Sequence, residues 1–356
     1  MDISRIKNIY FVLIRRNNLL LLTKTELLCF SKCHKVDILF IIFFISFSIY
    51  FYSHVSTLAN PPRDGADYLT NARNWLSNDP LYSKYRPPLI SWIIAGVWVI
   101  TGENWVIIKY LMPLFTLAAG IILYMLLRKE KGNLFAFGVS ALTLLNPHVF
   151  FWGEQIHTEG LSLFFIILTL YFLKSKNKNN WIWAGIAFGL TFASRYATLV
   201  EVTTIFVVEC IIRKDPRFAT KTLLTALPII LVSVLIVYLK VGYFMAAQES
   251  DTHFTLLLTP YYLQNSLNIW GFAILLVPVA FLFRRTYQEK FNYTFIAWFI
   301  VSLLFWSANS NPILHLPRYT VQFAPAVYFL ALLAVENLAK LYVRNDTKKN
   351  DEVHIE

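Results

Sequence analysis

Carboxylate and arginine side chains near the ends of long apolar runs are the residues of this 356-residue chain that could perform chemistry. The first of them lie in a charged stretch, residues 60–88, which directly follows an apolar run over about residues 36–55. This stretch contains Asp64 and Asp67, the first carboxylates after that run. Carboxylates accept protons and arginines bind anions, so residues of these types could support acid–base chemistry or hold a charged ligand.

The apolar runs that would position these residues are long enough to cross a lipid bilayer. The chain is 57% hydrophobic, its mean hydropathy is +0.53, and its apolar runs recur along nearly the whole sequence. A transmembrane helix needs about 20 such residues. The aromatic content of 17% is typical of proteins whose rings anchor helices at the membrane interfaces. We therefore predict an all-α, polytopic membrane protein, located in the cell membrane and in contact with membrane lipids.

Basic residues predict the orientation of these helices. The net charge is +11, but most lysines and arginines lie in short loops between apolar runs, which indicates membrane orientation and not nucleic-acid binding. We expect both termini, residues 1–35 and 341–356, to be cytoplasmic. The basic loops expected on the same side are Arg128–Lys131, Lys174–Lys178, Arg213–Arg217, Arg284–Lys290 and Lys340–Lys349.

About ten transmembrane helices fit between these loops, and they form one domain over residues 36–340 with an outer loop over residues 56–104. The predicted spans are 36–55, 105–127, 133–152, 159–173, 181–194, 196–212, 219–241, 266–283, 292–308 and 319–339. Residues 88–102 are also apolar, but a crossing there would move the Arg128 loop outside. At about 15 residues this segment is short for a span, so we predict a re-entrant or surface-lying helix.

Arg195 interrupts the apolar block of residues 181–212. A charged residue in the middle of the membrane costs roughly 2.5–3.5 kcal/mol on insertion scales, so we divide the block into two short helices with Arg195 at the outer face. Gly185 and Gly189 in the first helix form a pair of small residues four positions apart, which favours close packing of a neighbouring helix.

The predicted topology collects polar residues from five connections on the non-cytoplasmic side. Several lie at span ends, where contact with lipid is unfavourable, so we expect them to line one cavity. They are Arg63, Asp64, Asp67, Tyr68, Arg73, Lys84, Arg86, Glu154, His157, Glu159, Arg195, Tyr196, Glu249, Asp251, His253, His315, Arg318 and Tyr319.

Several of these residues also have purely structural explanations. Asp64 precedes Gly65 near the start of an amphipathic stretch, where a carboxylate can cap a helix. Glu159 begins a span, and an acid is favourable at a helix N-terminus. Arg195 and Arg318 could extend from the interface toward water with their stems in the apolar region. No single residue decides between structure and chemistry.

Five short motifs in a fixed order provide a stronger signal. They are DGADY (Asp64–Tyr68) with Ala72 and Arg73, RPPL (Arg86–Leu89), Asn146-Pro147 followed by EQIHTE (Glu154–Glu159), FASR (Phe192–Arg195), and PRY (Pro317–Tyr319). Over about residues 36–340 this series resembles the GT-C class of membrane glycosyltransferases that use polyprenyl-phosphate sugars, which includes protein O-mannosyltransferases and lipid A aminoarabinose transferases. The chain departs from the pattern at Gly65, where an acidic residue is common, and at Glu159, where Asp is common.

This resemblance implies a GT-C-like fold and an inverting transfer of a sugar from a polyprenyl-phosphate donor to a hydroxyl or phosphate of an acceptor on the non-cytoplasmic side. The acceptor would be a glycan, a lipid or a protein. Within this scheme Asp64 would be the base, because a sugar hydroxyl is a poor nucleophile until its proton is taken. A single displacement places base and leaving group on opposite faces of the anomeric carbon, so we expect Asp64 to lie far from the cations that bind the phosphate.

The same scheme assigns expected roles to the other outer residues. Arg195 and Arg318 are the preferred partners of the departing phosphate, and Lys84 and Arg86 are the next candidates. Tyr68, Tyr319 and Glu159 would contact the sugar, or Glu159 would orient a cation. The remaining expected substrate contacts are Asp67, Glu154 and His157. Carboxylates near a phosphate are compatible with Mg²⁺, but one arginine pair can neutralise the charge, so we predict no metal and no other cofactor.

Two other classes of protein fit parts of the pattern. A transporter or flippase of lipid-linked sugars or small anions would carry charged residues within the membrane. Here the charges gather toward the outer side, and no inverted repeat is evident, which favours the enzyme. The second alternative is a non-catalytic membrane subunit whose outer acids perform no reaction.

Overall fold

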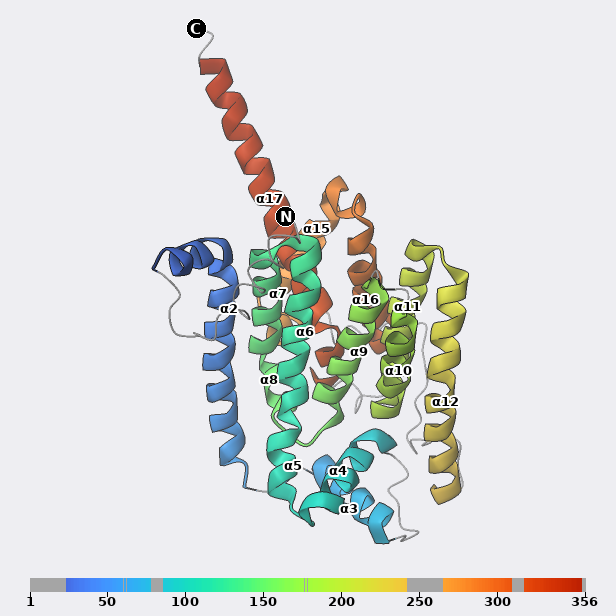
Figure 1. Cartoon of the computed structure of the whole chain (residues 1–356). Coiled ribbons are helices and arrows are strands. Elements are labelled where there is room, and N and C mark those ends of the chain that lie inside the picture. Colours follow the sequence, from blue (N-terminus) through green and yellow to red (C-terminus); the bar gives the residue numbers. More distant parts are fainter. Residues whose placement is uncertain are drawn as a thin grey trace. The chain divides into compact units, whose positions relative to one another are not determined.

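The computed structural model describes residues 24–59, 61, 63–77, 86–175, 177, 179–241, 265–308 and 317–353 (Figure 1). The chain divides into two compact units, residues 1–46 and 47–356. The described part of the first unit is the beginning of helix α2 (Lys24–Thr57). All remaining described elements belong to the second unit, and all of them are helices, as predicted.

Each predicted span has a helical counterpart. After α2, the α-helices are α3 (Arg63–Ser77), α4 (Pro88–Thr101), α5 (Trp105–Leu111), α6 (Pro113–Lys131), α7 (Asn133–Leu145), α8 (Pro147–Gly153), α9 (Thr158–Lys174), α10 (Asn180–Ser194), α11 (Leu199–Arg213), α12 (Pro216–Val241), α14 (Ser266–Trp270), α15 (Ala273–Leu282), α16 (Lys290–Ser307) and α17 (Ala324–Val353). Short 3-10 helices occur at η1 (Tyr196–Thr198), η2 (Arg284–Tyr287) and η4 (Pro317–Phe323).

The predicted count of about ten membrane crossings is not confirmed. Four described helical segments are long and apolar enough to cross a membrane: Lys35–Thr57, Trp105–Lys131, Pro216–Lys240 and Pro317–Val343. A fifth is obtained if α7 and α8, which meet at 62°, count as one broken span. Most of the other described helices are too short; α10, for example, has 15 residues where a straight crossing needs about 20.

The break between α7 and α8 follows from two adjacent residues. Pro147 lacks a backbone N–H and disfavours helical geometry at the residue before it, so α7 ends at Leu145. The Asn146 side chain then accepts hydrogen bonds from the backbone N–H groups of His148 and Val149 and begins α8. Helix α8, which leads to Glu154 and the start of α9, is therefore bent by 62° relative to α7.

Basic connections lie together at one end of the second unit. Lys131 forms an ion pair with Glu289, and Lys174 lies 2.7 Å from Glu209. Helix α6 carries the chain about 22 Å between Pro113 and Arg128, at about 1.5 Å per residue. The Arg128 turn therefore lies at the end opposite α3 and α4, as Figure 1 shows. Which end faces the cytoplasm stays a prediction.

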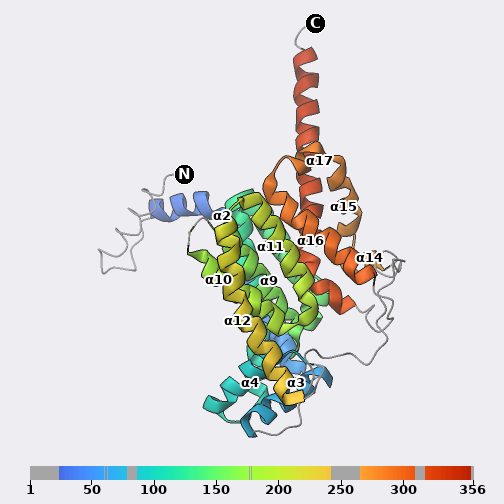
Figure 2. The same cartoon turned by 90° about the vertical axis from the view of Figure 1, so that its right-hand side faces the viewer.

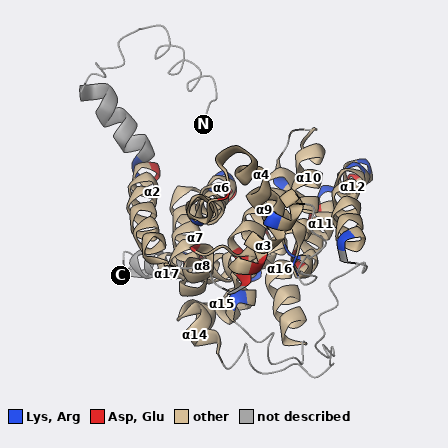
Figure 3. Cartoon of the chain, turned by 90° about the horizontal axis from the view of Figure 1, so that it is seen from below, with Lys and Arg blue, Asp and Glu red and all other residues tan. Residues whose placement is uncertain are grey.

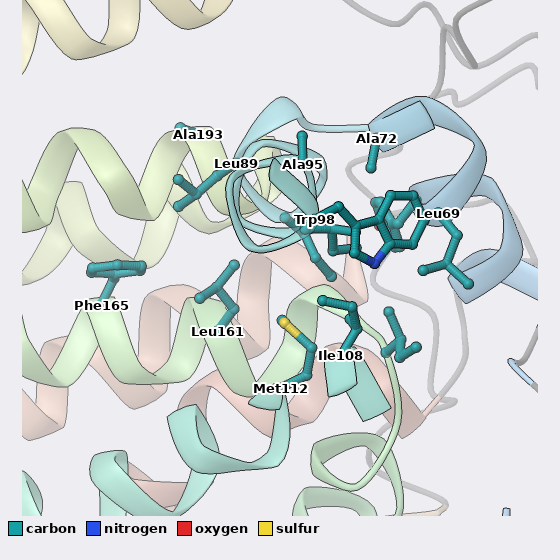
Figure 4. Close-up of a cluster of buried hydrophobic side chains, with 14 of the residues drawn as sticks. Leu69, Ala72, Leu89, Ala95, Trp98, Ile108, Met112, Leu161, Phe165 and Ala193 are labelled. Atoms are coloured by element: carbon teal, nitrogen blue, oxygen red, sulfur yellow. The ribbon is translucent and has the colours of Figure 1, made fainter. Parts of the chain in front are cut away.

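Helices α3 and α4 pack together at the other end. Tyr68 and Leu69 of α3, Leu89 and Trp98 of α4, and Ile108 of α5 share one buried apolar cluster (Figure 4). The cluster continues onto α9 and α10. With 14 residues, α4 is too short for a straight crossing, which agrees with the predicted short helix. This packing fixes the charged start of α3 against the helices that carry the other site residues.

Close packing of α10 against α12 confirms the expectation from the paired glycines, and the two helices lie side by side in Figures 1 and 2. A Cβ added at Gly185 would lie 2.5 Å from the backbone oxygen of Thr222. At Gly189 it would lie 3.0 Å from the backbone oxygen of Ala226. Because a backbone cannot rotate away as a side chain can, α12 would have to shift.

A glycine-to-alanine pair tests this contact. Gly185→Ala should lower the free energy of unfolding by about 1–3 kcal/mol, because the added methyl group overpacks a helix interface. The matched control is Gly96→Ala in α4, where an added Cβ meets nothing within 4 Å. This change should be neutral or stabilising by up to about 1 kcal/mol, since alanine is the better helix former. Unfolding midpoints of both variants in detergent measure the difference, and equal midpoints would contradict the proposed packing.

Candidate active site

The acidic residues of α3 are joined by Arg86. Asp64 and Asp67 are three positions apart on α3 and therefore lie on one face of the helix. Arg86 donates from Nη2 to Asp64 Oδ1 at 2.6 Å and to Asp67 Oδ2 at 2.8 Å. A further bond runs from its Nε to Asp67 Oδ2 at 3.1 Å. Since Arg86 directly precedes the two prolines that begin α4, this contact ties the start of α3 to the start of α4.

Asp64 also pairs with a residue 254 positions later in the chain. Arg318 of η4 donates from Nη1 to Asp64 Oδ2 at 2.8 Å, and Nδ1 of His157 lies 3.9 Å from the same oxygen. Burial raises the pKa of Asp64, but the charges of Arg86, His157 and Arg318 outweigh burial and hold the pKa below its ordinary value. Asp64 is therefore ionised at neutral pH.

Glu159 forms the second carboxylate centre. It lies in the first turn of α9 and is 1% exposed. Arg195 donates from Nη1 to Glu159 Oε1 at 2.5 Å, and Nδ1 of His157 lies 3.2 Å from Oε2. Nε of Arg318 lies 4.0 Å from Oε1. His157 and Arg318 thus stand between Asp64 and Glu159 and join both carboxylates into one network.

Arg195 reaches Glu159 because α10 ends directly before it. Its backbone is extended, with φ −162° and ψ +114°, and η1 begins at the next residue. The predicted break between two short helices is therefore confirmed. It places the guanidinium against a carboxylate, where the ion pair offsets the cost of burying both charges.

Aromatic rings surround the two arginines of this network. The guanidinium of Arg195 lies 4.7 Å from the centre of the Tyr319 ring, and Arg318 donates to the Tyr319 hydroxyl at 3.1 Å. Trp306 stacks on Tyr319 with 4.5 Å between ring centres. Trp152 lies edge-on to His157 at 5.1 Å. These contacts restrict the side chains of Arg195, Arg318 and His157.

On α3, Tyr68 contributes a buried phenol to the same region. Its ring centre lies 5.5 Å from the guanidinium of Arg86. Burial raises the pKa of Tyr68 to about 12. Smaller effects come from Arg86, which lowers this pKa, and from Glu159, which raises it. The phenol therefore stays neutral and can donate a hydrogen bond.

Nine of the residues predicted from the sequence lie in this network: Asp64, Asp67, Tyr68, Arg86, His157, Glu159, Arg195, Arg318 and Tyr319. Seen from the α3 end, acidic residues gather beside α3 near the middle of the bundle (Figure 3). Lys84, Glu249, Asp251, His253 and His315 lie outside the described residues. Arg73 is turned away and pairs with Glu103 at an exposed position.

Two sequence expectations need revision. We expected Asp64 to lie far from the cations that bind the phosphate, and this prediction is wrong for Arg318 and Arg86. Both arginines donate directly to Asp64, because a partly buried carboxylate requires compensating charge. Glu154 joins a different contact: it is 2% exposed, and its Oε2 lies 2.8 Å from Nδ1 of His54 on α2.

Three residues at or beside the site were not predicted from the sequence: His54, Trp152 and Trp306. His54 lies at the end of the first apolar run, six residues before the charged stretch, and this position was its only signal. The two tryptophans lie inside apolar segments, where a tryptophan of the site cannot be distinguished from one that anchors a helix at the membrane interface. Among the residues that the structure describes, no group of three His, Cys, Asp or Glu side chains could hold a metal ion.

Solved structures of similar fold come from bacteria and archaea. ArnT from Cupriavidus metallidurans bound to undecaprenyl phosphate has a TM-score of 0.66 and 16% sequence identity, over 83% of this chain and 60% of that protein. The oligosaccharyltransferase AglB from Archaeoglobus fulgidus, in complex with an inhibitory peptide and a dolichol-phosphate, has a TM-score of 0.57 and 12% identity, over 90% of this chain and 52% of that protein. The fold is that of the GT-C membrane glycosyltransferases.

Sequence comparison supports the same class. The family described as dolichyl-phosphate-mannose-protein mannosyltransferase matches residues 85–243, somewhat under half of the chain. The lipid A galacturonosyltransferase RgtD of Rhizobium johnstonii is 27% identical over 147 residues, which are 39% of this chain and 31% of that protein. The chain thus spans under a third of this relative and about half to three fifths of the solved structures.

The low pKa of Asp64 predicts a defined response to acid. A carboxyl group whose pKa is lowered by folding contributes stability above its unfolded pKa, about 3.9, and this contribution is lost as the pH falls through the folded value. The stability difference between the unmodified protein and Asp64→Asn should therefore be constant from pH 8 to about pH 5 and shrink below about pH 4. Unfolding midpoints across this range measure it. A difference that grows on acidification would contradict the pairing of Asp64 with Arg86 and Arg318.

Proposed function

We propose that this chain is a membrane glycosyltransferase that moves a sugar from a polyprenyl-phosphate donor to a hydroxyl of an acceptor on the non-cytoplasmic side, with inversion at the anomeric carbon. The observation that carries the proposal is the single network that joins Asp64 to Glu159 through Arg318 and His157. The fold, the family match and the undecaprenyl phosphate in the ArnT structure support this class of reaction and donor.

Asp64 is the proposed base. The acceptor oxygen bonds to the anomeric carbon while the bond from that carbon to the phosphate oxygen breaks. The hydroxyl proton passes to a carboxylate oxygen of Asp64, and the phosphate leaves with the bonding electrons. Its low pKa keeps Asp64 ready to accept the proton but also makes it a weak base. A donor phosphate that draws Arg318 toward itself would remove one stabilising charge from Asp64 and raise its basicity.

Arg195 is the better placed cation for the leaving phosphate. In an inverting displacement the base and the leaving group lie on opposite faces of the reacting carbon. Arg195 pairs with Glu159 and not with Asp64, so it fits this requirement, whereas Arg318 bridges the two sides. Guanidinium groups stabilise developing phosphate charge strongly in poorly hydrated sites, so we propose that the reaction needs no divalent ion.

The remaining residues of the network would hold the sugar. Glu159 and Asp67 offer carboxylate oxygens to sugar hydroxyls, and the neutral phenol of Tyr68 offers a donor. Tyr319 contacts both Trp306 and Arg195, so the orientation of its ring is fixed. His157 lies between the two carboxylates and can keep both oriented.

Replacement of the proposed base gives the direct test. Asp64→Asn keeps the shape of the side chain but cannot accept the proton, so sugar transfer should fall by about 10²–10⁴-fold. The assay uses the purified protein in vesicles with radiolabelled polyprenyl-phosphate sugar and an extract of candidate acceptors, with and without EDTA. Activity that EDTA abolishes would contradict metal independence. Movement of the sugar across the vesicle membrane without bond formation would favour the transporter.

Two arginine variants test phosphate recognition. Arg318→Gln should weaken binding of undecaprenyl phosphate by roughly 10–100-fold, because a hydrogen bond to a charged group contributes about 1.5–3 kcal/mol. The matched control is Arg73→Gln, whose ion pair with Glu103 is about half exposed on both sides and should contribute little. Binding is measured with labelled undecaprenyl phosphate on protein in lipid nanodiscs. Equal losses in both variants would indicate a general charge effect and not a site.

A further inference from the structure

A groove lies beside the network of Asp64 and Glu159, and its described lining residues do not include the arginines of that network. It has a volume of about 590 Å³, within the range of small-ligand sites. Its walls come from the end of α2, from α8 and from the residue that precedes Arg318, and they are Tyr50, His54, Pro147, His148, Phe150, Phe151, Trp152, Glu154 and Pro317. All of these residues belong to the second compact unit.

Trp152 and Pro317 connect the groove to the proposed active site. The centre of the Trp152 ring lies 5.1 Å from that of His157 and 5.8 Å from the guanidinium carbon of Arg318. Pro317 is bonded to Arg318. A molecule in the groove would therefore end beside the residues that surround Asp64.

The groove has one polar pair, His54 and Glu154. Glu154 is buried at the end of α8, and its Oε2 lies 2.8 Å from Nδ1 of His54. Burial raises the pKa of Glu154, with the contact to His54 acting in the opposite direction. Phe150 packs edge-on against the His54 ring at 5.4 Å. Because Nδ1 is engaged by Glu154 and the side chain is half exposed, Nε2 is the nitrogen that can meet a ligand in the groove.

Charge distinguishes the two possible lipid-like occupants. A polyprenyl phosphate requires cations, whereas the described arginines of this region, Arg86, Arg195 and Arg318, pair with Asp64, Asp67 and Glu159 and do not line the groove. The groove instead presents a buried carboxylate, two histidines, His54 and His148, and aromatic rings. This combination suits an uncharged molecule with hydroxyl groups and an apolar portion. The opposite approach of nucleophile and leaving group in an inverting reaction also favours separate entrances.

We infer that this groove receives the acceptor, an amphipathic molecule that presents hydroxyl groups, and that His54, held by Glu154, positions it through a hydrogen bond at Nε2. The inference rests on the proposed function, since it assigns the second substrate of that reaction. His54 is a positioning residue in this scheme, and proton transfer remains with Asp64.

Protection of His54 from chemical modification tests the groove without requiring transfer. The full-length protein in nanodiscs is treated with diethylpyrocarbonate, which carbethoxylates accessible imidazoles, and peptide mass spectrometry reads His54 separately from the other six histidines. The probes are n-octyl β-D-glucoside, below its micellar concentration, and undecaprenyl phosphate. The glucoside should slow modification of His54 several-fold and undecaprenyl phosphate should not. Protection by undecaprenyl phosphate instead, or by neither probe, would overturn the inference whether or not the protein proves to be a transferase.

Two substitutions separate the two nitrogens of His54. An asparagine amide can take the place of Nδ1 toward Glu154, whereas a glutamine amide reaches the place of Nε2. His54→Asn should weaken binding of labelled octyl glucoside by between about twofold and tenfold, as for one lost hydrogen bond, and His54→Gln should restore most of it. Ser56→Ala, an exposed change on the same helix, is the control. Unchanged affinity in His54→Asn, or equal loss in both variants, would overturn the role of Nε2. Undecaprenyl phosphate affinity should be unchanged in all three variants.

Discussion

The sharing of Asp64 between Arg86 and Arg318 is the interaction on which the arrangement of the site depends. One arginine lies 22 residues after Asp64 and the other 254 residues after it. A partly buried carboxylate is unfavourable without compensating charge, so α3, the start of α4 and η4 must meet for this end of the bundle to fold. The apolar cluster of α3, α4 and α5 brings the backbones together, and the ion pairs define the register.

The same pairing creates a conflict between stability and chemistry. A carboxylate with two guanidinium partners is stably ionised, and this makes it a poor proton acceptor. A phosphate that competes for Arg318 would relieve the conflict. The positive charge of Arg318 would then stabilise the leaving phosphate instead of Asp64. The network therefore provides a physical route by which binding of a donor could increase the basicity of Asp64.

The charged residues of the site lie where helices begin, end or change type. Asp64 and Glu159 are in the first turns of α3 and α9, Arg195 follows the last residue of α10, and Arg318 is in η4. Backbone groups at helix ends lack partners within the helix, and side chains there can reach sideways between neighbours. In this bundle the charged residues of the site therefore lie where helices are interrupted.

The amino-acid sequence by itself determined the helical class, the positions of the helices and the residue types of the site, because apolar runs and helix breaks are local properties of the chain. It also indicated the break at Arg195, since a charge inside an apolar block is unfavourable wherever the chain folds. The tertiary structure decided the partners. Three contacts depend on how helices distant in sequence pack: Arg318 with Asp64, Glu154 with His54, and Trp152 with His157. Such packing is set by side-chain volumes and charges on several helices at once, which no single segment specifies.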